Sequence, residues 1–274
     1  MNSKKWMLLA VLSFCILAIS VKEISSSISS FEIIFFRSII GLLILILFFY
    51  RSFPKTSFKT IKKHLFRNVF HLLGQYGWIV GITYLSLSEV TAIEFTVPIW
   101  VIIIAAIFLD ERITKIKIIS IVLGFIGVLI ILKPGIELIT LNSIIVLASA
   151  ISYAITHVFT KKIVKSSSAL EVVIIMCLIQ MPISFFIALP EWHFPLRSDY
   201  FWLSLVGISA LVAHFSLAKA FQKNNISDLI VIDYLRLPIL VLVGILFYNE
   251  EFSYALVLGG TLIISGNYLN NKRA

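Results

Sequence analysis

The chain has 274 residues, of which 59% are hydrophobic and only 14% are charged, and its mean hydropathy is +1.02. Soluble domains carry about 25% charged residues, and many windows of this sequence exceed the roughly 18 apolar residues that cross a bilayer. This composition excludes a soluble globular domain and predicts an all-α, polytopic membrane protein. The net charge of +9 does not indicate nucleic-acid binding, because the basic residues stand in short segments between apolar stretches.

Ten apolar stretches follow one another and predict ten transmembrane helices. They cover residues 6–21, 31–50, 65–86, 90–109, 118–133, 141–160, 169–189, 201–222, 227–248 and 253–270. The first stretch follows two lysines, as the apolar part of a signal peptide does, but no A-x-A cleavage site comes after it. We therefore expect it to remain in the protein as a transmembrane helix.

The Lys and Arg residues predict how these helices are oriented. If the N-terminus is cytoplasmic, eighteen of the 23 basic residues fall on the cytoplasmic side, and only Lys22, Lys133 and Arg197 fall on the outer side. Arg37 and Arg236 lie within predicted helices. Because basic loops stay in the cytoplasm, the sequence predicts a multi-pass inner-membrane protein with both termini in the cytoplasm.

The second half of the chain repeats the first at one constant offset, the one that carries Lys22 onto Lys161. The same offset aligns Glu32 with Glu171, Gln75 with His214, Glu94 with Asp233, Glu111 with Glu250 and Gly127 with Gly266. We therefore predict two units of five helices, 1–135 and 141–274. Because five is odd, the second unit must be inverted in the membrane relative to the first. Inverted repeats are the architecture of secondary transporters, whose substrate site lies between the two units.

Ionisable residues within the predicted helices are candidates for function, because a charge near the middle of a bilayer costs about 2.5–3.5 kcal/mol and needs a partner. Asp233 and Arg236 stand three residues apart on one helix face, next to Pro238, which breaks the helix, and they are expected to pair. The pair is either structural or part of a substrate site or gate. Glu94 is the repeat counterpart of Asp233, so the two carboxylates suggest gates or proton sites on opposite sides. The alternative is that Glu94 pairs with Arg37.

Two predicted helices carry polar and aromatic stripes at helical spacing. Asn68, His71, Gln75 and Trp78 form one continuous face of 65–86, and Ser149, Tyr153 and His157 form one of 141–160. The stripes predict a shared polar and aromatic cavity, although interhelical hydrogen bonds alone would give the same pattern.

We expect a substrate to stack on aromatic rings in this cavity, because aromatic faces suit planar or cationic ligands. The candidate substrate-binding residues are Arg37, His71, Gln75, Trp78, Trp100, Tyr153, His157, His214, Tyr234 and Arg236. The candidates for gating or proton coupling are Glu94 and Asp233.

Three segments carry a family resemblance, namely EFTVPIW…FLDERI (94–113), VLGFIGVLIILKP (122–134) and YLRLP…FYNEE (234–251). They are similar to the EamA family of the drug/metabolite transporter superfamily. The resemblance covers essentially the whole chain and implies ten helices in two inverted repeats, cytoplasmic termini and a central substrate cavity. It also implies that Glu111 and Glu250 are structural residues of two loops. Within the family, FEIIFFR (31–37) and LAKAF (217–221) resemble members that take up S-adenosylmethionine, and such motifs also occur in amino-acid exporters and riboflavin carriers.

No catalytic motif appears, since the sequence contains neither H-E-x-x-H nor G-x-S-x-G and no glycine-rich phosphate loop. We therefore predict a secondary carrier, not an enzyme, for a small organic metabolite such as S-adenosylmethionine. The alternatives are a broad-specificity exporter of amino acids or drugs, a membrane-embedded enzyme and a structural subunit. We expect no cofactor and no metal site, and no nucleic acid as a partner. The expected partners are the metabolite and membrane lipids, and a homodimer is left open.

Overall fold

The structure is a computed structural model that describes residues 2–52, 58–85, 90, 93–132, 140–247 and 254–272. This part of the chain is helical and contains no strand. Six of its helices are long and apolar enough to span a membrane, namely Ser3–Ile24, Ser30–Phe49, Leu141–Ile163, Ala169–Glu191, Asp199–Phe221 and Ile226–Phe247. The all-helical prediction is therefore confirmed, and the helices fit a multi-pass membrane protein. Ten crossings and inverted repeats stay predictions. Lys133 and Glu250 lie outside the described residues.

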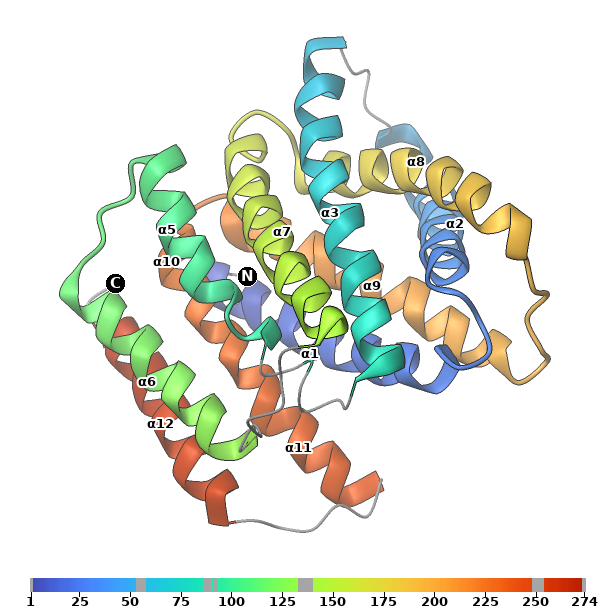
Figure 1. Cartoon of the computed structure of the whole chain (residues 1–274). Helices are drawn as coiled ribbons and strands as arrows, with labels where there is room; N and C mark the ends of the chain where they lie inside the picture. Colours follow the sequence, from blue (N-terminus) through green and yellow to red (C-terminus); the bar gives the residue numbers. More distant parts are fainter. Residues whose placement is uncertain are drawn as a thin grey trace.

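The helices follow one another along the chain with short connections (Figure 1). The first half has α1 (Ser3–Ile24), α2 (Ser30–Phe49), η1 (Tyr50–Ser52), α3 (Phe58–Tyr84), α5 (Val97–Leu109) and α6 (Lys115–Leu132). The second half has α7 (Leu141–Ile163), α8 (Ala169–Ala188), η2 (Leu189–Glu191), α9 (Asp199–Phe221), α10 (Ile226–Leu229), η3 (Ile230–Leu235), α11 (Arg236–Phe247) and α12 (Tyr254–Lys272).

Short polar side chains determine where several helices begin. At the start of α2, the Ser29 hydroxyl accepts a hydrogen bond from the Glu32 N–H, and the Glu32 carboxylate accepts one from the Ser29 N–H. Thr140 and Ser143 form the same reciprocal pair at the start of α7. Such capping boxes satisfy backbone N–H groups that have no partner within the helix, so each of these helices starts at a defined residue.

Two of the predicted helices are interrupted at corresponding places. α5 begins at Val97, with Pro98 as its second residue, after a turn that separates it from Glu94. α11 begins at Arg236, two residues before Pro238, and the tighter 3₁₀ helix η3 precedes it. Proline lacks an N–H, and its ring clashes with the carbonyl four residues earlier, so a regular α-helix does not continue through these points. The break at Pro238 was predicted, but a continuous helix over 90–109 was not correct.

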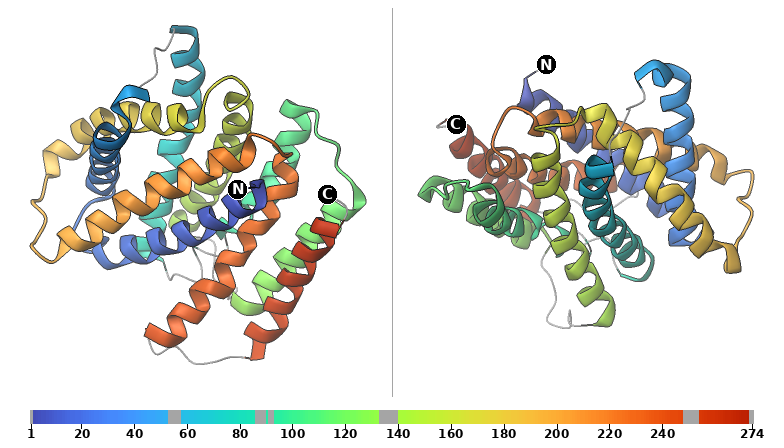
Figure 2. Two further views of the ribbon diagram at one scale, coloured as in Figure 1. Left: turned by 180° about the vertical axis from the view of Figure 1, so that it is seen from behind. Right: turned by 90° about the horizontal axis from the view of Figure 1, so that it is seen from above.

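The helices pack in pairs that join the two halves of the chain. α1 lies along α9, α3 along α7, α2 along α8, and α6 along α12. Figure 1 shows α6 and α12 side by side at one end of the molecule, while α2 and α8 lie at the other end, and Figure 2 shows α1 and α9 side by side from behind. Every one of these pairs combines a helix from before residue 135 with a helix from after residue 141.

Small residues allow α6 and α12 to approach closely. A Cβ atom built on Gly127 would lie 2.6 Å from the Gly259 carbonyl oxygen, and one built on Gly266 would lie 2.7 Å from the Ser120 carbonyl oxygen. Membrane helices associate through such close backbone approaches, because lipid tails provide no hydrophobic driving force between helices. The two contacts are related by the repeat, whose offset carries Ser120 onto Gly259 and Gly127 onto Gly266.

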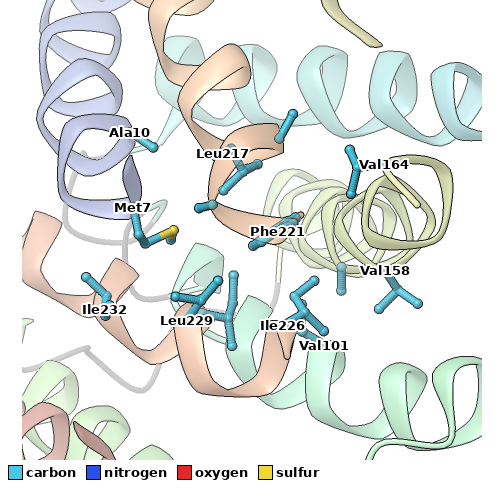
Figure 3. Packing of buried hydrophobic residues seen from close by; sticks show 14 of the residues in the cluster. Met7, Ala10, Val101, Val158, Val164, Leu217, Phe221, Ile226, Leu229 and Ile232 are labelled. Carbon is cyan, nitrogen blue, oxygen red and sulfur yellow. The ribbon is translucent and has the colours of Figure 1, made fainter. Parts of the chain in front are cut away.

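The largest apolar cluster of the described residues joins side chains from several helices. Figure 3 shows side chains of this cluster from α1, α5, α7, α9, α10 and η3 pointing toward one another. The labelled residues are Met7, Ala10, Val101, Val158, Val164, Leu217, Phe221, Ile226, Leu229 and Ile232. Many large apolar side chains are instead exposed on the outer faces of the helices, among them Leu47, Ile107, Phe186 and Phe247. An exposed apolar surface of this extent fits a protein that faces lipid.

Candidate functional site

A small cavity lies where α1, α2, α3, α5, α7, α9 and η3 meet. Its volume is about 50 Å³, which accommodates a few water molecules, whereas ligand pockets have volumes of about 300–1,000 Å³. Its polar and aromatic lining consists of Phe14, Arg37, Gln75, Trp78, Glu94, Tyr153, His157, His214, Asp233 and Arg236, and the remaining lining is apolar. The structure therefore shows a narrow cavity around a polar centre.

One wall of the cavity is a network of three charged residues. The Arg236 guanidinium donates to the Asp233 carboxylate over 2.6 Å and to the Glu94 carboxylate over 2.9 Å. The Trp78 indole N–H donates to the other oxygen of Glu94 over 3.0 Å. The predicted pair of Asp233 and Arg236 is thus confirmed, whereas Glu94 pairs with Arg236 and not with Arg37. Removing one member of a buried network of this kind costs about 3–5 kcal/mol, because a charge is left uncompensated.

Two phenylalanine rings contact the Arg236 guanidinium. Its central carbon lies 5.5 Å from the centroid of the Phe14 ring and 5.3 Å from that of the Phe95 ring. Aromatic faces attract a guanidinium, and more strongly where water is excluded. Neither ring was singled out from the sequence as a site residue, since phenylalanine is abundant in membrane helices. The repeat does offer one signal, because Phe95 aligns with Tyr234.

A second wall of the cavity is built around Arg37. Its guanidinium donates to the Gln180 side-chain oxygen over 2.7 Å and contacts His214 Nε2 at 3.3 Å. The amide nitrogen of Gln180 in turn contacts His71 Nδ1 at 2.8 Å. Because arginine only donates, Gln180 must turn its oxygen to Arg37 and its NH₂ to His71, and His214 Nε2 must accept. Arg37 therefore determines the orientation of Gln180 and the tautomer of His214.

The predicted stripe on α3 lies in the interior of the protein. Asn68, His71, Gln75 and Trp78 are all buried. The Gln75 amide nitrogen contacts the His71 ring, and the His71 and His214 rings meet edge to face with centroids 4.5 Å apart. His71 and His214 come from different halves of the chain, so this contact joins α3 to α9.

The second predicted stripe, on α7, also reaches the cavity. Tyr153 and His157 line it, with their rings stacked at 6.4 Å, and the Tyr153 ring lies against Gly74 of α3. The Ser149 hydroxyl donates to the Gly74 carbonyl. The absence of a side chain at Gly74 is what allows the Tyr153 ring to lie against α3 beside the cavity.

Three predicted substrate-binding residues stand outside the cavity lining. Trp100 donates from its indole N–H to the Thr96 hydroxyl over 3.2 Å and packs against the largest apolar cluster. The Tyr234 ring packs against Gly124 of α6. His71 stands one layer behind the cavity, in contact with the lining residues Gln75 and His214.

Arg67 and Glu32 are buried polar residues that were not predicted from the sequence as site residues. Arg67 was counted with the cytoplasmic basic residues, but it is 1% exposed and donates to Thr160 of α7 and to Asn68. Its position four residues before His71 extends the α3 stripe by one turn, which is the signal that could have indicated burial. Glu32 accepts a hydrogen bond from the His193 N–H over 2.7 Å and so ties the start of α2 to the segment after η2.

Glu111 has the structural role that the family resemblance implies. Its carboxylate accepts hydrogen bonds from the Ile226 and Ser227 N–H groups, at 2.9 and 3.2 Å, and from the Ser227 hydroxyl. It therefore caps the start of α10, which leads into η3. Within the described residues no group of three or more His, Cys, Asp or Glu side chains is arranged to hold a metal ion.

Comparison with known proteins identifies relatives that match almost the whole chain. The EamA-like transporter family matches residues 4–133 and again residues 141–272. The S-adenosylmethionine uptake transporter of Rickettsia prowazekii is 27% identical over 96% of this chain and 90% of its own length. The protein of the same name from Rickettsia conorii is 28% identical over 94% of this chain and 88% of its own length.

A riboflavin transporter and a solved structure are also similar. The riboflavin transporter of Vibrio cholerae is 27% identical over 73% of this chain and 68% of its own length. A solved crystal structure superposes with a TM-score of 0.84 at 14% identity, covering 99% of this chain and 97% of that one. At this identity the superposition speaks for the fold alone.

Proposed function

The chain belongs to the EamA-like transporter family, and from that premise we propose that it is a secondary carrier that moves a small organic metabolite by alternating access. The observation that carries the proposal is the central cavity, which is enclosed by helices of both halves and lined by charged, polar and aromatic side chains. Charged side chains are costly inside a membrane and generally mark a transport pathway there. The chain is a membrane transporter and not an enzyme, as its family and its named relatives indicate.

The small volume of the cavity implies that the protein must change conformation to bind its substrate. A volume of about 50 Å³ does not hold a metabolite, so the surrounding helices must move apart on one side at a time. We propose that the interruptions before α5 and α11 allow this movement, because broken helices at the binding site are a recurrent feature of transporters. Glu94 and Asp233 lie next to these interruptions and are our candidates for gating or proton coupling.

The pairing of helices supports two inverted units, 1–135 and 141–274. The offset of the repeat carries α1 onto α7 and α3 onto α9, so that the α1–α9 pair corresponds to the α7–α3 pair. It carries α2 onto α8 and α6 onto α12, so in each of these two pairs a helix packs against its own counterpart in the other half. This is the pattern that a twofold relation between two units would produce. With it we propose the inner membrane as the location and the cytoplasm for both termini.

For the substrate we propose a cofactor-like metabolite such as S-adenosylmethionine. The relatives that match over 94–96% of this chain are named as uptake transporters of that compound. The cavity lining fits a ligand with a planar ring and charged groups, because Trp78, Tyr153 and Phe14 stand beside Arg37 and Glu94. Riboflavin, the compound named for a relative with lower coverage, is the comparison substrate.

Uptake into liposomes tests this function directly. Purified protein is reconstituted, and entry of radiolabelled S-adenosylmethionine and of riboflavin is measured with and without a pH gradient, against empty liposomes. We expect saturable uptake of S-adenosylmethionine. Glu94→Gln, which removes a charge from the cavity, should reduce its rate at least about tenfold, since a charge-assisted hydrogen bond contributes about 1.5–3 kcal/mol.

Glu171→Gln is the matched control, because Glu171 stands in the first turn of α8 and does not line the cavity. Its uptake should equal that of the unmodified protein. Uptake of neither compound above the level of empty liposomes would refute the carrier proposal. Equal losses in both variants would refute the role of Glu94.

A further inference from the structure

The charges that line the cavity are divided unequally between its two walls. Four charged residues line it, the arginines Arg37 and Arg236 and the carboxylates Glu94 and Asp233. Both carboxylates pair with Arg236, and no carboxylate of the described residues forms a salt bridge with Arg37. One wall therefore carries an excess of negative charge and the other an unpaired positive charge, although the lining as a whole is neutral.

Arg37 is held in this position by neutral groups. It is 6% exposed, and its guanidinium hydrogen-bonds to the side chains of Gln180 and His214. A cation buried without a counter-ion is strongly destabilising, and membrane proteins place one only where it pairs or serves a pathway. Arg67 is likewise buried and held by neutral groups, but of the two arginines only Arg37 lines the cavity. Its position in the lining is therefore what allows its unpaired charge to meet an anionic ligand group.

The surroundings of Arg37 offer further hydrogen-bond donors to such an anion. Since His214 Nε2 accepts from Arg37, the neutral imidazole carries its proton on Nδ1. This Nδ1 is buried and has no hydrogen-bond partner among the described residues, and His214 lines the cavity. A guanidinium together with an imidazole N–H is a set of donors that suits a carboxylate, which accepts bidentate hydrogen bonds from arginine.

The wall with the Arg236 network offers acceptors to a cation. Glu94 uses one oxygen for Arg236 and the other for Trp78, and each carboxylate oxygen can accept a second hydrogen bond. Its side chain is 14% exposed, the most accessible of the three members of the Arg236 network. The ring of Phe14 contacts both groups of residues, since its centroid lies 5.4 Å from that of the His214 ring and 5.5 Å from the central carbon of the Arg236 guanidinium. Phe14 is therefore in contact with a residue of each group.

We propose that the cavity selects zwitterionic substrates, binding a carboxylate at Arg37 and His214 and a cationic group, several bonds away, at Glu94. This inference rests on the proposed carrier function and adds the substrate class and the orientation of the substrate. Arg37 is a binding residue in this arrangement. Gln180 is a positioning residue, because it acts through Arg37 and His71.

Binding of two ligands that differ only in the carboxylate tests the proposal. Equilibrium binding of S-adenosylmethionine and of decarboxylated S-adenosylmethionine is measured on the purified full-length protein by isothermal titration calorimetry. We expect the decarboxylated compound to bind about 10- to 100-fold more weakly, as loss of a hydrogen bond between charged groups predicts. In Arg37→Gln this preference should vanish, with the two compounds binding within about threefold of each other.

Arg67→Gln is the matched control, because Arg67 is a second buried arginine that donates to neutral groups, and it does not line the cavity. It should keep the preference for the carboxylate. If Arg37→Gln does not fold, the same comparison is made with the unmodified protein and with Arg37→Lys, which keeps the charge. Both should then prefer the compound with the carboxylate. The proposal is overturned if the unmodified protein binds the two compounds equally or binds neither of them. It is also overturned if Arg37→Gln keeps the preference for the compound with the carboxylate.

The outcomes separate this inference from the carrier proposal. A carboxylate preference without uptake into liposomes would leave the zwitterion site standing and remove the carrier function. Uptake of riboflavin that Arg37→Gln does not change would leave a carrier and overturn the zwitterion site.

Discussion

The contact between α6 and α12 predicts that a single added methyl group at Gly127 destabilises the protein. In Gly127→Ala the new Cβ would lie 2.6 Å from the Gly259 carbonyl oxygen and 2.8 Å from Ile263 Cγ1. Both distances are well below van der Waals contact, and a backbone carbonyl cannot rotate out of the way as the end of a side chain can. The two helices must therefore separate, which weakens their packing along the whole contact.

The magnitude follows from the two effects that an alanine brings. Overpacking of a well-packed site costs about 1–3 kcal/mol, while replacing glycine by alanine in a helix gains roughly 0.8–1.0 kcal/mol. Gly260→Ala isolates the second effect, because a Cβ built on Gly260 of α12 meets nothing within 4 Å. The free energy of unfolding of the two variants should therefore differ by about 2 kcal/mol, with Gly127→Ala the less stable.

The assay is thermal unfolding of the two detergent-purified variants at a single scan rate, since membrane proteins often unfold irreversibly. A difference of about 2 kcal/mol corresponds to roughly 4–8 °C in Tm for a chain of this size. If Gly127→Ala melted at the same temperature as Gly260→Ala, or above it, the close contact between α6 and α12 would not exist in solution and the reasoning would be wrong.

Three other contacts give further predictions. Glu111→Ala removes the cap of α10 and leaves the Ser227 hydroxyl without its acceptor. It should lower the free energy of unfolding by about 1–2 kcal/mol in the same assay, and an unchanged Tm would contradict this role. Lys161→Met removes the ammonium group that donates to two carbonyls at the end of α9, each at 2.6 Å, and should lower the free energy of unfolding by about 1–3 kcal/mol. Lys162→Met is the control, and a smaller loss of stability in Lys161→Met than in this control would show that the two hydrogen bonds do not form. Gly74→Ala places a Cβ 3.0 Å from the Tyr153 ring, so it should raise the KM of uptake severalfold while Tm stays within a few degrees; an unchanged KM would place Tyr153 outside the substrate path.

Much of the fold could be predicted because bilayer physics leaves few alternatives. Apolar stretches of sufficient length indicate helices, and one constant offset relates the two halves. The interruptions were harder to predict, because α5 and α11 lie within apolar stretches that look continuous. We predicted the break near Pro238 from its proline, but did not use the same signal at Pro98, although α5 and α11 begin at corresponding residues, Val97 and Arg236.

The charged residues of the site could be predicted, but their partners could not. Arg37, Glu94, Asp233 and Arg236 stand out in apolar stretches, and the structure places all four around one cavity. Which arginine pairs with Glu94 depends on how α5 lies relative to η3, and this is a tertiary contact without a local signal.

The aromatic residues show the same limit for a different reason. Tyr234 lies in a 3₁₀ segment with about three residues per turn, so side chains there point in other directions than an α-helix would give. Asp233 lines the cavity while its neighbour Tyr234 turns to Gly124 of α6. Adjacent residues already point about 100° apart on an α-helix, but the sequence did not show which of the two faces the cavity.

The reciprocal contacts between α6 and α12 have a consequence for how such a carrier could move. With the two inverted units and the alternating access that we propose, the passage from one open state to the other would exchange the conformations of the two units. That exchange turns the contact of Gly127 with Gly259 into the contact of Gly266 with Ser120, and the reverse. The pair of contacts is therefore unchanged by the exchange. The α6–α12 interface can stay assembled throughout the cycle as a fixed axis, while the opening and closing movements are confined to the helices around the cavity.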